Sequence, residues 1–357
     1  MRAVTVFPVV FLSIVVTLSC GVFAAPLRLW SGDAPGAAGN SSADIPTLDI
    51  NKPAPSVANG AAILMVPGGA YGTVVMSEAD AAKSFWLPKG FVVAVLKYRV
   101  APYKYPYLMY DVKRAMRILR SKTKELGLVN SRIGILGCSA GGHLASYLAT
   151  HYDAGNPDTA DTIEQQHCRP DFSIFVYPVI TMDASFTHAD TRRNLLGDTP
   201  PQALVDSLCN EKQVTGNTPP TFLVHGTVDD VVPVKNSQVF YDACVAHDVD
   251  AKFYRIESSC GYHGLPYSCE NWADTCFKWL TDGGYLETPT GTVAPPGATS
   301  LPVQPATAAA GTPVRFDLSG NVLPAAGAWR SNGVFITAKR IDGRYIPVKT
   351  QVLSGTR

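Results

Sequence analysis

Short apolar segments alternate with helix-like segments through the middle of the chain. Apolar runs predict buried strands at residues 61–67, 91–100, 132–137, 172–180, 221–226 and 251–257. Helical patterns are predicted at residues 111–127, 140–152, 235–247 and 270–280. Strands that alternate with helices favour a mainly parallel sheet with right-handed crossovers, so we expect a fold of the α/β class.

The predicted helix at 111–127 has one strongly basic side. Its apolar stripe includes Val112 and Leu119, and Gly127 closes it. Its other side carries five cations: Lys113, Arg114, Arg117, Arg120 and Lys124. Such a run is typical of a solvated helix face, and we expect that here rather than a binding site for a polyanion.

The first residues have the layout of a secretory signal peptide. Arg2 precedes an apolar run, and small residues follow around Ala24, so a signal peptide is predicted over 1–24. An uncleaved anchor is the alternative, but the run is shorter than the roughly 20 residues that span a bilayer. We therefore expect no stable membrane insertion after cleavage. The expected location is secreted or extracellular, with the periplasm or cell surface as the other exported sites.

A change in composition marks the end of the predicted catalytic domain, which we place at 26–285. Residues 286–313 are rich in Pro, Thr, Ala and Gly with almost no charge, which predicts an extended linker. Residues 314–357 contain short strand-like pieces. This tail is interpreted as a small β-rich module or a sorting tail, with an unstructured tail as the third possibility.

Composition narrows the function classes. The chain is 46% hydrophobic and 17% charged, which favours a sizeable folded core. A formal net charge of +1 argues against nucleic acid as a partner. No C-x-x-C pair occurs, which disfavours zinc. We therefore expect neither a metal nor an organic cofactor.

The cysteines permit a disulfide near the end of the predicted domain. Removing residues 1–24 would take Cys20 from the eight cysteines and leave seven, an odd number that leaves at least one without an intrachain partner. The most plausible bridge joins Cys260 to Cys269, although two free thiols remain the alternative.

A nucleophile motif lies between a predicted strand and a predicted helix. Residues 137–141, Gly-Cys-Ser-Ala-Gly, match G-x-S-x-G, and such a strand-to-helix turn exposes its serine above the sheet. The predicted nucleophile is Ser139. Cys138 is expected to pack inward, and His143 is expected to pack near the turn rather than act as the base.

The other catalytic residues should follow later strands, because active sites of such sheets lie beyond the carboxyl ends of the strands. Asp229 and Asp230 come just after the strand at 221–226, and His263 comes after the last predicted strand. The H-G-x-x-D spacing favours Asp229 over Asp230 as the acid. His225, within that motif, is expected to shape the loop. The order Ser, Asp, His is the order of α/β hydrolases.

A turn after the first predicted strand is placed to bind an oxyanion. Pro67 is followed by Gly68, Gly69 and Ala70, and glycines let backbone N–H groups approach a substrate oxygen. Ala140, the residue after the nucleophile, would supply a further N–H. The alternative interpretation is an ordinary tight turn.

Residues 27–282 resemble the acetylxylan-esterase-like, feruloyl and acetyl esterase (BD-FAE-like) branch of the α/β-hydrolase superfamily. The resemblance rests on LRLWSGDAPG, VPGGAYG, LKYRVAPYKYP, ILGCSAGGHLAS, RPDFSIFVYPVI, TPPTFLVHGTVDDVVP and GYHGL. It implies the α/β-hydrolase fold, with Ser139, Asp229 and His263 as a triad and the Pro-Gly-Gly turn as the oxyanion region. Many lipase-like relatives have histidine where Pro67 stands, which makes their substrate class a poorer match.

The resulting hypothesis is a secreted serine esterase. It would hydrolyse acetyl or feruloyl esters through an acyl-enzyme, on plant cell-wall carbohydrate such as acetylated xylan or on a small ester. Two alternatives stay open. One is a peptidase or amidase of the prolyl-oligopeptidase type, and the other is a non-catalytic binding protein with a hydrolase fold.

Overall fold

The computed structural model describes residues 25–286, 314–316, 322–323, 333–341 and 344–353. The chain divides into two compact units, Met1–Thr288 and Pro289–Arg357. The predicted signal peptide and nearly all of the predicted linker lie outside the described residues. Among the described helices, none combines the length and the apolar character needed to cross a membrane.

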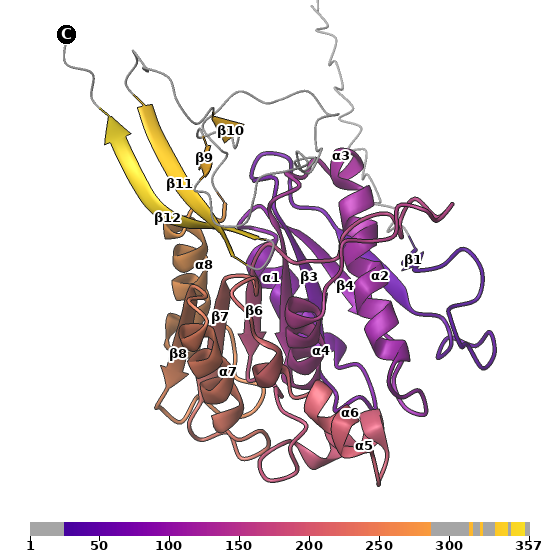
Figure 1. The fold of residues 1–357 in the computed structure, drawn as a ribbon. Coiled ribbons are helices and arrows are strands. Elements are labelled where there is room, and N and C mark those ends of the chain that lie inside the picture. Colours follow the sequence, from indigo (N-terminus) through magenta and orange to yellow (C-terminus); the bar gives the residue numbers. More distant parts are fainter. Residues whose placement is uncertain (1–24, 287–313, 317–321, 324–332, 342–343, 354–357) are drawn as a thin grey trace, which may run out of the picture. The chain divides into compact units, whose positions relative to one another are not determined.

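The first unit is built on an eight-stranded sheet in the order β1-β2-β4-β3-β5-β6-β7-β8. Strands β3 to β8 pair in parallel, whereas β1 with β2 and β2 with β4 are antiparallel. The bounds are β1 (Leu27–Arg28), β2 (Thr47–Asn51), β3 (Ala62–Val66), β4 (Val92–Lys97), β5 (Ile133–Cys138), β6 (Ser173–Val176), β7 (Thr221–Gly226) and β8 (Ala251–Ile256). The expected α/β-hydrolase fold, with a mainly parallel sheet flanked by helices, is confirmed (Figure 1).

Helices cover both faces of the sheet. Their bounds are α1 (Met76–Trp86), α2 (Tyr107–Ser121), α3 (Thr123–Leu126), α4 (Ser139–Thr150), α5 (Ala189–Leu196), α6 (Gln202–Ser207), η1 (Asn210–Gln213), α7 (Lys235–Ala246), η2 (Cys269–Asn271) and α8 (Trp272–Asp282). Buried residues of α2, α4 and α7 form one core, and those of α1 and α8 form the other. Because both faces are covered, the central strands consist of apolar residues without alternation.

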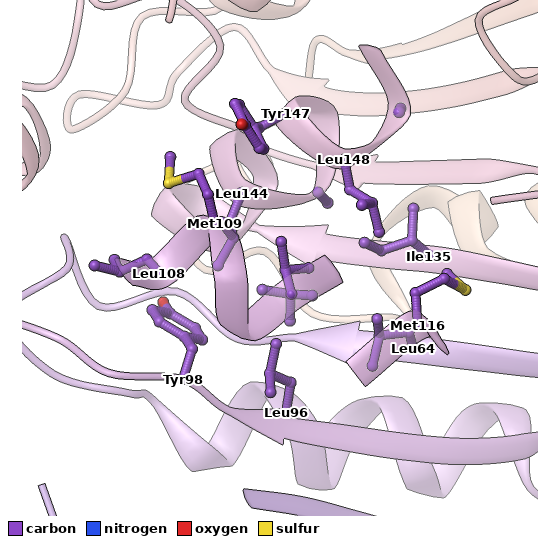
Figure 2. Close-up of a cluster of buried hydrophobic side chains, with 14 of the residues drawn as sticks. Leu64, Leu96, Tyr98, Leu108, Met109, Met116, Ile135, Leu144, Tyr147 and Leu148 are labelled. Carbon is purple, nitrogen blue, oxygen red and sulfur yellow. The ribbon is translucent and has the colours of Figure 1, made fainter. Parts of the chain in front are cut away.

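Side chains of one strand alternate between the two cores. Leu64 packs with the α2 and α4 side of the sheet, whereas Ile63 and Met65 pack with the α1 and α8 side. Figure 2 shows the first core, where Leu64, Leu96 and Ile135 of the strands lie among side chains of α2 and α4. This packing fixes the strand carboxyl ends, which carry the loops of the candidate site.

Most predicted elements are present with small shifts of their ends, and the strand at 221–226 has its predicted bounds, but the strand predicted at 172–180 ends already at Val176. The predicted helix at 111–127 is two helices, α2 and α3, and α2 begins earlier, at Tyr107. Strands β1 and β2 and helices α1, α5 and α6 were not predicted. Helix α1 did carry a signal, because its buried residues Ala79, Ala82 and Trp86 are spaced by three and four positions.

Helix α2 was expected to have a solvated basic face, and this expectation is wrong for its three arginines. Arg114, Arg117 and Arg120 are buried. The segment between α4 and β6 folds over them and supplies the partner carboxylates Asp153, Asp161, Glu164 and Asp171. Buried cations need such pairing, and the pairing depends on residues that lie more than 30 positions away in the sequence.

The second unit contains strands within its described residues. They are β9 (Val314–Phe316), β10 (Val322–Leu323), β11 (Gly333–Ile341) and β12 (Arg344–Leu353). They pair antiparallel in the order β10-β9-β11-β12. Whether this tail is a β-module or a sorting tail stays a prediction.

Candidate active site

The serine predicted as the nucleophile sits at a sharp turn between β5 and α4. Strand β5 ends at Cys138 and α4 begins at Ser139, which has a φ of 53°. Neighbouring backbone leaves no room for side chains on the flanking glycines. A Cβ on Gly137 would lie 2.3 Å from the carbonyl oxygen of Gly141, and one on Gly141 would lie 2.1 Å from that of Val66. The glycines are therefore required by close backbone contact.

Three side chains from separate loops form one hydrogen-bonded chain. Nε2 of His263 lies 3.0 Å from Oγ of Ser139, and Nδ1 of His263 lies 2.8 Å from Oδ2 of Asp229. Ser139 follows β5, Asp229 follows β7 and His263 follows β8, so all three lie beyond strand carboxyl ends. With its Nδ1–H donated to Asp229, the imidazole presents Nε2 as the acceptor for the serine proton.

The aspartate is buried and bound on both carboxylate oxygens. Its side chain is 0% exposed, and Oδ1 accepts the N–H groups of Val231 (2.9 Å) and Val232 (2.8 Å). Burial alone would raise the pKa of Asp229, but hydrogen bonds from His225, His263 and Val232 outweigh it and hold the pKa well below its usual range. Asp229 is therefore ionised at neutral pH. The neighbouring Asp230, the other carboxylate considered for this role, is exposed.

The other reactive side chains near the turn have structural contacts. His143 is buried, with Nδ1 2.9 Å from the Tyr71 hydroxyl and Nε2 2.9 Å from the Leu208 carbonyl oxygen. Burial lowers the pKa of His143 to about 4, so the ring is neutral. Burial also raises the pKa of the Cys138 thiol, which leaves it a poor nucleophile. These contacts agree with the packing roles that we expected.

His225 bridges the loop that carries the acid. Its Nδ1 lies 2.8 Å from the Ser237 hydroxyl, and its Nε2 lies 2.9 Å from the Val232 carbonyl oxygen and 3.2 Å from Oδ2 of Asp229. The ring is buried. It thus fastens the Asp229 loop to α7, as its expected loop-shaping role requires.

The Pro-Gly-Gly turn after β3 lies against the serine. A Cβ on Gly68 would be 2.8 Å from Cβ of Ser139, so glycine is needed there. However, the Gly68 N–H donates to Oε2 of Glu78 at 2.6 Å, so it is not free to bind a substrate oxyanion. The expectation for Gly68 is corrected accordingly: it permits close approach, and its N–H serves the scaffold.

Three backbone donors remain for an oxyanion. Within the described residues the N–H groups of Gly69 and Ala70 have no acceptor. Ala140 is the second residue of α4, and the first N–H groups of a helix have no intrahelical acceptor. Gly69 has a φ of 121° and Ala70 one of 53°, so the chain turns sharply beside Ser139. Asn194 of α5 donates to the Ala70 carbonyl oxygen at 2.8 Å and fixes this turn.

Sequence reasoning missed the residues that support this site. Glu78 of α1 binds the Pro-Gly-Gly turn, which is the candidate oxyanion turn, and Tyr177 packs its ring against His263 with a centroid separation of 4.8 Å. Asn194 belongs to α5, which was also missed. Tyr177 lies inside the strand predicted at 172–180, whereas β6 ends at Val176, so the predicted bounds hid its place beyond a strand end. The pairing of Glu78 with Gly68 has no local signature.

A disulfide brackets the histidine. Cys260 and Cys269 are joined, as predicted, and His263 lies between them. The free cysteines of the described residues, Cys138, Cys168, Cys209, Cys244 and Cys276, are all buried. Within the same residues, no three His, Cys, Asp or Glu side chains gather as a metal site would require.

A serine at a strand-to-helix turn, with histidine and aspartate on later loops of a mostly parallel sheet, defines the α/β hydrolases. The family model described as BD-FAE matches residues 48–244, more than half of the 357 residues. The chain therefore belongs to the BD-FAE family.

Curated relatives match the same region. An endo-1,4-beta-xylanase B of Butyrivibrio fibrisolvens is 35% identical over 212 residues, which cover 57% of this chain and 32% of the relative. An acetylxylan esterase of Xylanibacter ruminicola is 31% identical over 191 residues, covering 52% of this chain and 37% of the relative. The matched region thus spans about a third of the length of these relatives.

Solved structures share the fold. An acetyl ester-xyloside bifunctional hydrolase from Caldicellulosiruptor lactoaceticus superposes with a TM-score of 0.68 at 35% identity, over 73% of this chain and 97% of that one. An esterase from Thermogutta terrifontis has a TM-score of 0.59 at 22% identity, over 75% of this chain and 97% of that one. The second likeness concerns the fold alone.

Proposed function

We propose that this protein is a serine esterase that removes acetyl or feruloyl groups from plant cell-wall carbohydrate such as acetylated xylan. One observation carries the proposal: the unbroken hydrogen-bond chain from Ser139 through His263 to Asp229. A serine hydroxyl is a poor nucleophile unless a base removes its proton, and this chain provides both the base and the acid that orients it.

The reaction follows from these contacts in two halves. Oγ of Ser139 attacks the ester carbonyl carbon while Nε2 of His263 takes the serine proton. The carbonyl oxygen becomes an oxyanion, for which the N–H groups of Gly69, Ala70 and Ala140 are the donors. The bond to the sugar oxygen breaks and His263 protonates that oxygen. Water then attacks the acyl-enzyme by the same proton route and releases the acid.

Asp229 contributes a permanent negative charge beside the imidazole. Hydrogen bonds hold its pKa well below the usual range despite burial, so it stays ionised when His263 becomes positively charged. It therefore orients the ring and stabilises the imidazolium without accepting the proton itself.

The relatives support an ester of a sugar. The names of two similar proteins specify an acetylxylan esterase and an acetyl ester-xyloside hydrolase. The loops that carry the acid and the base also hold exposed apolar side chains, Val228, Val231 and Tyr262. Exposed apolar groups beside a polar centre are typical of ligand-binding surfaces.

We also propose that the protein acts outside the cytoplasm, secreted or held in the periplasm or at the cell surface. The signal-like residues 1–24 support this location. So does the Cys260–Cys269 disulfide, because such bonds persist in oxidising compartments.

The test is to measure acetate and ferulate release from acetylated xylan, pectin and arabinoxylan side by side, with a peptide panel alongside. We expect acetate release from xylan to be the fastest of these reactions, or ferulate release from arabinoxylan if the acyl group is feruloyl. Cleavage of peptides without release of either acid would contradict the proposal and support the peptidase alternative.

A further inference from the structure

Glu78 holds two parts of the candidate site that are distant in the sequence. It lies in the first turn of α1, and each oxygen of its carboxylate accepts one hydrogen bond. Oε2 accepts the N–H of Gly68 at 2.6 Å, and Oε1 accepts the hydroxyl of Tyr177 at 3.1 Å. Such charge-assisted hydrogen bonds are stronger than neutral ones.

The first of these bonds fixes the oxyanion turn. The Gly68 carbonyl oxygen accepts the Val75 N–H at 3.1 Å, so the start of α1 holds both polar groups of Gly68. Gly68 lies directly against Ser139, and the candidate donors Gly69 and Ala70 follow it. A shift of Gly68 would therefore move those N–H groups relative to the serine. Misplacement of about 1 Å at such a site can cost roughly 100-fold in rate.

The second bond fixes the ring that supports the base. Tyr177 follows β6 with a φ of 37°, and its N–H donates to the Val224 carbonyl oxygen at 2.8 Å. Its ring packs edge-on against the His263 imidazole, with the planes at 60°. Glu78 anchors the hydroxyl of that ring, so the carboxylate that holds the oxyanion turn also restrains the surroundings of the base.

We propose that Glu78 is a positioning residue. It fixes the oxyanion turn and the ring beside the catalytic histidine relative to each other, and it adds a second negative charge near the imidazolium. The inference rests on the proposed esterase function. Asp229 contacts the imidazole directly, whereas Glu78 acts through Gly68 and Tyr177 and through its charge. Burial raises the pKa of Glu78, opposed by its hydrogen bonds and by the charge of His263.

The test compares four variants. Glu78→Ala removes both bonds and the charge, and Glu78→Gln keeps an acceptor for Gly68 but loses the charge. Tyr177→Phe removes the bond from the hydroxyl to Glu78 and leaves the bond to Gly68. Asp80→Asn is the matched control, because Asp80 is an exposed carboxylate in the same helix and pairs with Lys83. Each variant is assayed for kcat and KM on p-nitrophenyl acetate, for its pH profile and for its melting temperature.

We expect kcat to fall on the order of 10- to 100-fold in Glu78→Ala, with KM changed less than about twofold, because the donors act on the transition state. Glu78→Gln should recover part of this loss, and Tyr177→Phe should lose only a few-fold. Asp80→Asn should match the wild type. A kcat of Glu78→Ala within about twofold of the wild type would overturn the proposal, as would a loss matched by Asp80→Asn.

The pH profile separates positioning from mere folding support. A negative charge beside the imidazolium stabilises it, so Glu78→Gln should move the acid limb of kcat/KM to lower pH, and Asp80→Asn should leave it in place. An acid limb unchanged in Glu78→Gln would contradict the charge role. The titratable groups that face Glu78 are His263, Tyr177, Tyr98, Cys138 and Tyr267.

One readout does not depend on esterase activity. The imidazole NMR resonances of His263 should shift in Glu78→Ala relative to the wild type, because Glu78 anchors the Tyr177 ring that packs against the imidazole, and Asp80→Asn should show no change. If the wild type hydrolyses no ester but this shift is present, the proposed function fails and the positioning role stands. If esters are hydrolysed and the shift is absent, the positioning role fails alone.

Discussion

The proposed nucleophile and the proposed base are held in place in different ways. Ser139 sits where β5 ends and α4 begins, and backbone contacts fix that turn: Gly137 lies against Gly141, and Gly141 lies against Val66 of β3. His263 sits on a loop between β8 and α8, with its side chain 21% exposed. Side-chain contacts from Asp229 and Tyr177 and the Cys260–Cys269 bridge hold this loop.

The difference separates control of geometry by backbone packing from control by side-chain contacts. The serine is placed by backbone packing, within the turn at Gly137 and against β3 at Gly141, so a change there acts on the fold first and on activity as a consequence. The histidine is placed by partners that are distant in sequence, so a change there acts on activity while most of the fold remains. The predictions below test this contrast, beginning with the largest effect.

Gly141→Ala should break the turn. Its Cβ would lie 2.1 Å from the Val66 carbonyl oxygen, a contact that no side-chain movement can relieve. We expect a loss of at least about 3 kcal/mol in the free energy of unfolding, or no folded protein, measured by denaturant unfolding. Gly32→Ala is the control, because nothing lies within 4 Å of a Cβ there. Normal stability of Gly141→Ala would show that the turn is not fixed by backbone contact.

Asp229→Asn should leave the fold intact and lower kcat on the order of 10³- to 10⁴-fold, because an amide favours the wrong imidazole tautomer. The control is Asp230→Asn, a neighbouring exposed carboxylate, which should retain wild-type kcat. Equal losses in the two variants, measured on p-nitrophenyl acetate, would remove the distinction between these residues.

The same aspartate predicts a pH dependence of stability. Its folded-state pKa is depressed, so its contribution to stability is present above its unfolded pKa of about 3.9 and is lost as pH falls toward the folded value. The difference in unfolding free energy between wild type and Asp229→Asn should therefore be constant above about pH 5 and shrink below about pH 4. A difference that shrank between pH 5 and 8 would contradict the depressed pKa.

Loss of the Cys260–Cys269 bridge should loosen the histidine loop. A Cys260→Ser, Cys269→Ser double variant should lose kcat several-fold and about 2–3 kcal/mol of stability. Reducing agent should slow the wild type and leave the double variant unchanged, because the free cysteines of the described residues are buried. Full activity after verified reduction would show that loop contacts alone position His263.

Tyr262→Ala should give the smallest effect. The side chain is 50% exposed and precedes the base, so it can contact a sugar but does not hold the fold. We expect KM for an acetylated xylo-oligosaccharide to rise roughly 3- to 10-fold relative to KM for p-nitrophenyl acetate, as loss of one aromatic contact implies. An unchanged ratio of the two KM values would exclude Tyr262 from sugar binding.

The local features of this site were predictable from the sequence. The strand, Gly-Cys-Ser-Ala-Gly and helix order placed Ser139 at the turn, and the H-G-x-x-D spacing separated Asp229 from Asp230. His263 was predicted from its place after the last strand of the domain. These features depend on neighbouring residues or on the order of elements, which a single sequence contains.

The supporting contacts could not be predicted, because they join distant segments. Gly68 was expected to donate to an oxyanion, but Glu78 occupies its N–H from a helix that was not predicted. The buried Arg114 was expected to be solvated, and its partners Asp161 and Glu164 lie in a loop far along the chain. Neither pairing leaves a periodic or motif-like pattern.

The most direct measurement of the central claim is covalent labelling by a fluorophosphonate, with the modified residue located by mass spectrometry. We predict one adduct, on Ser139. As this adduct forms, the protein should lose its ability to release acetate from acetylated xylan. Ser139→Ala should take up no label and release no acetate while keeping the wild-type circular dichroism spectrum. Labelling at another residue, or acetate release by Ser139→Ala, would contradict the assignment of Ser139 as the nucleophile.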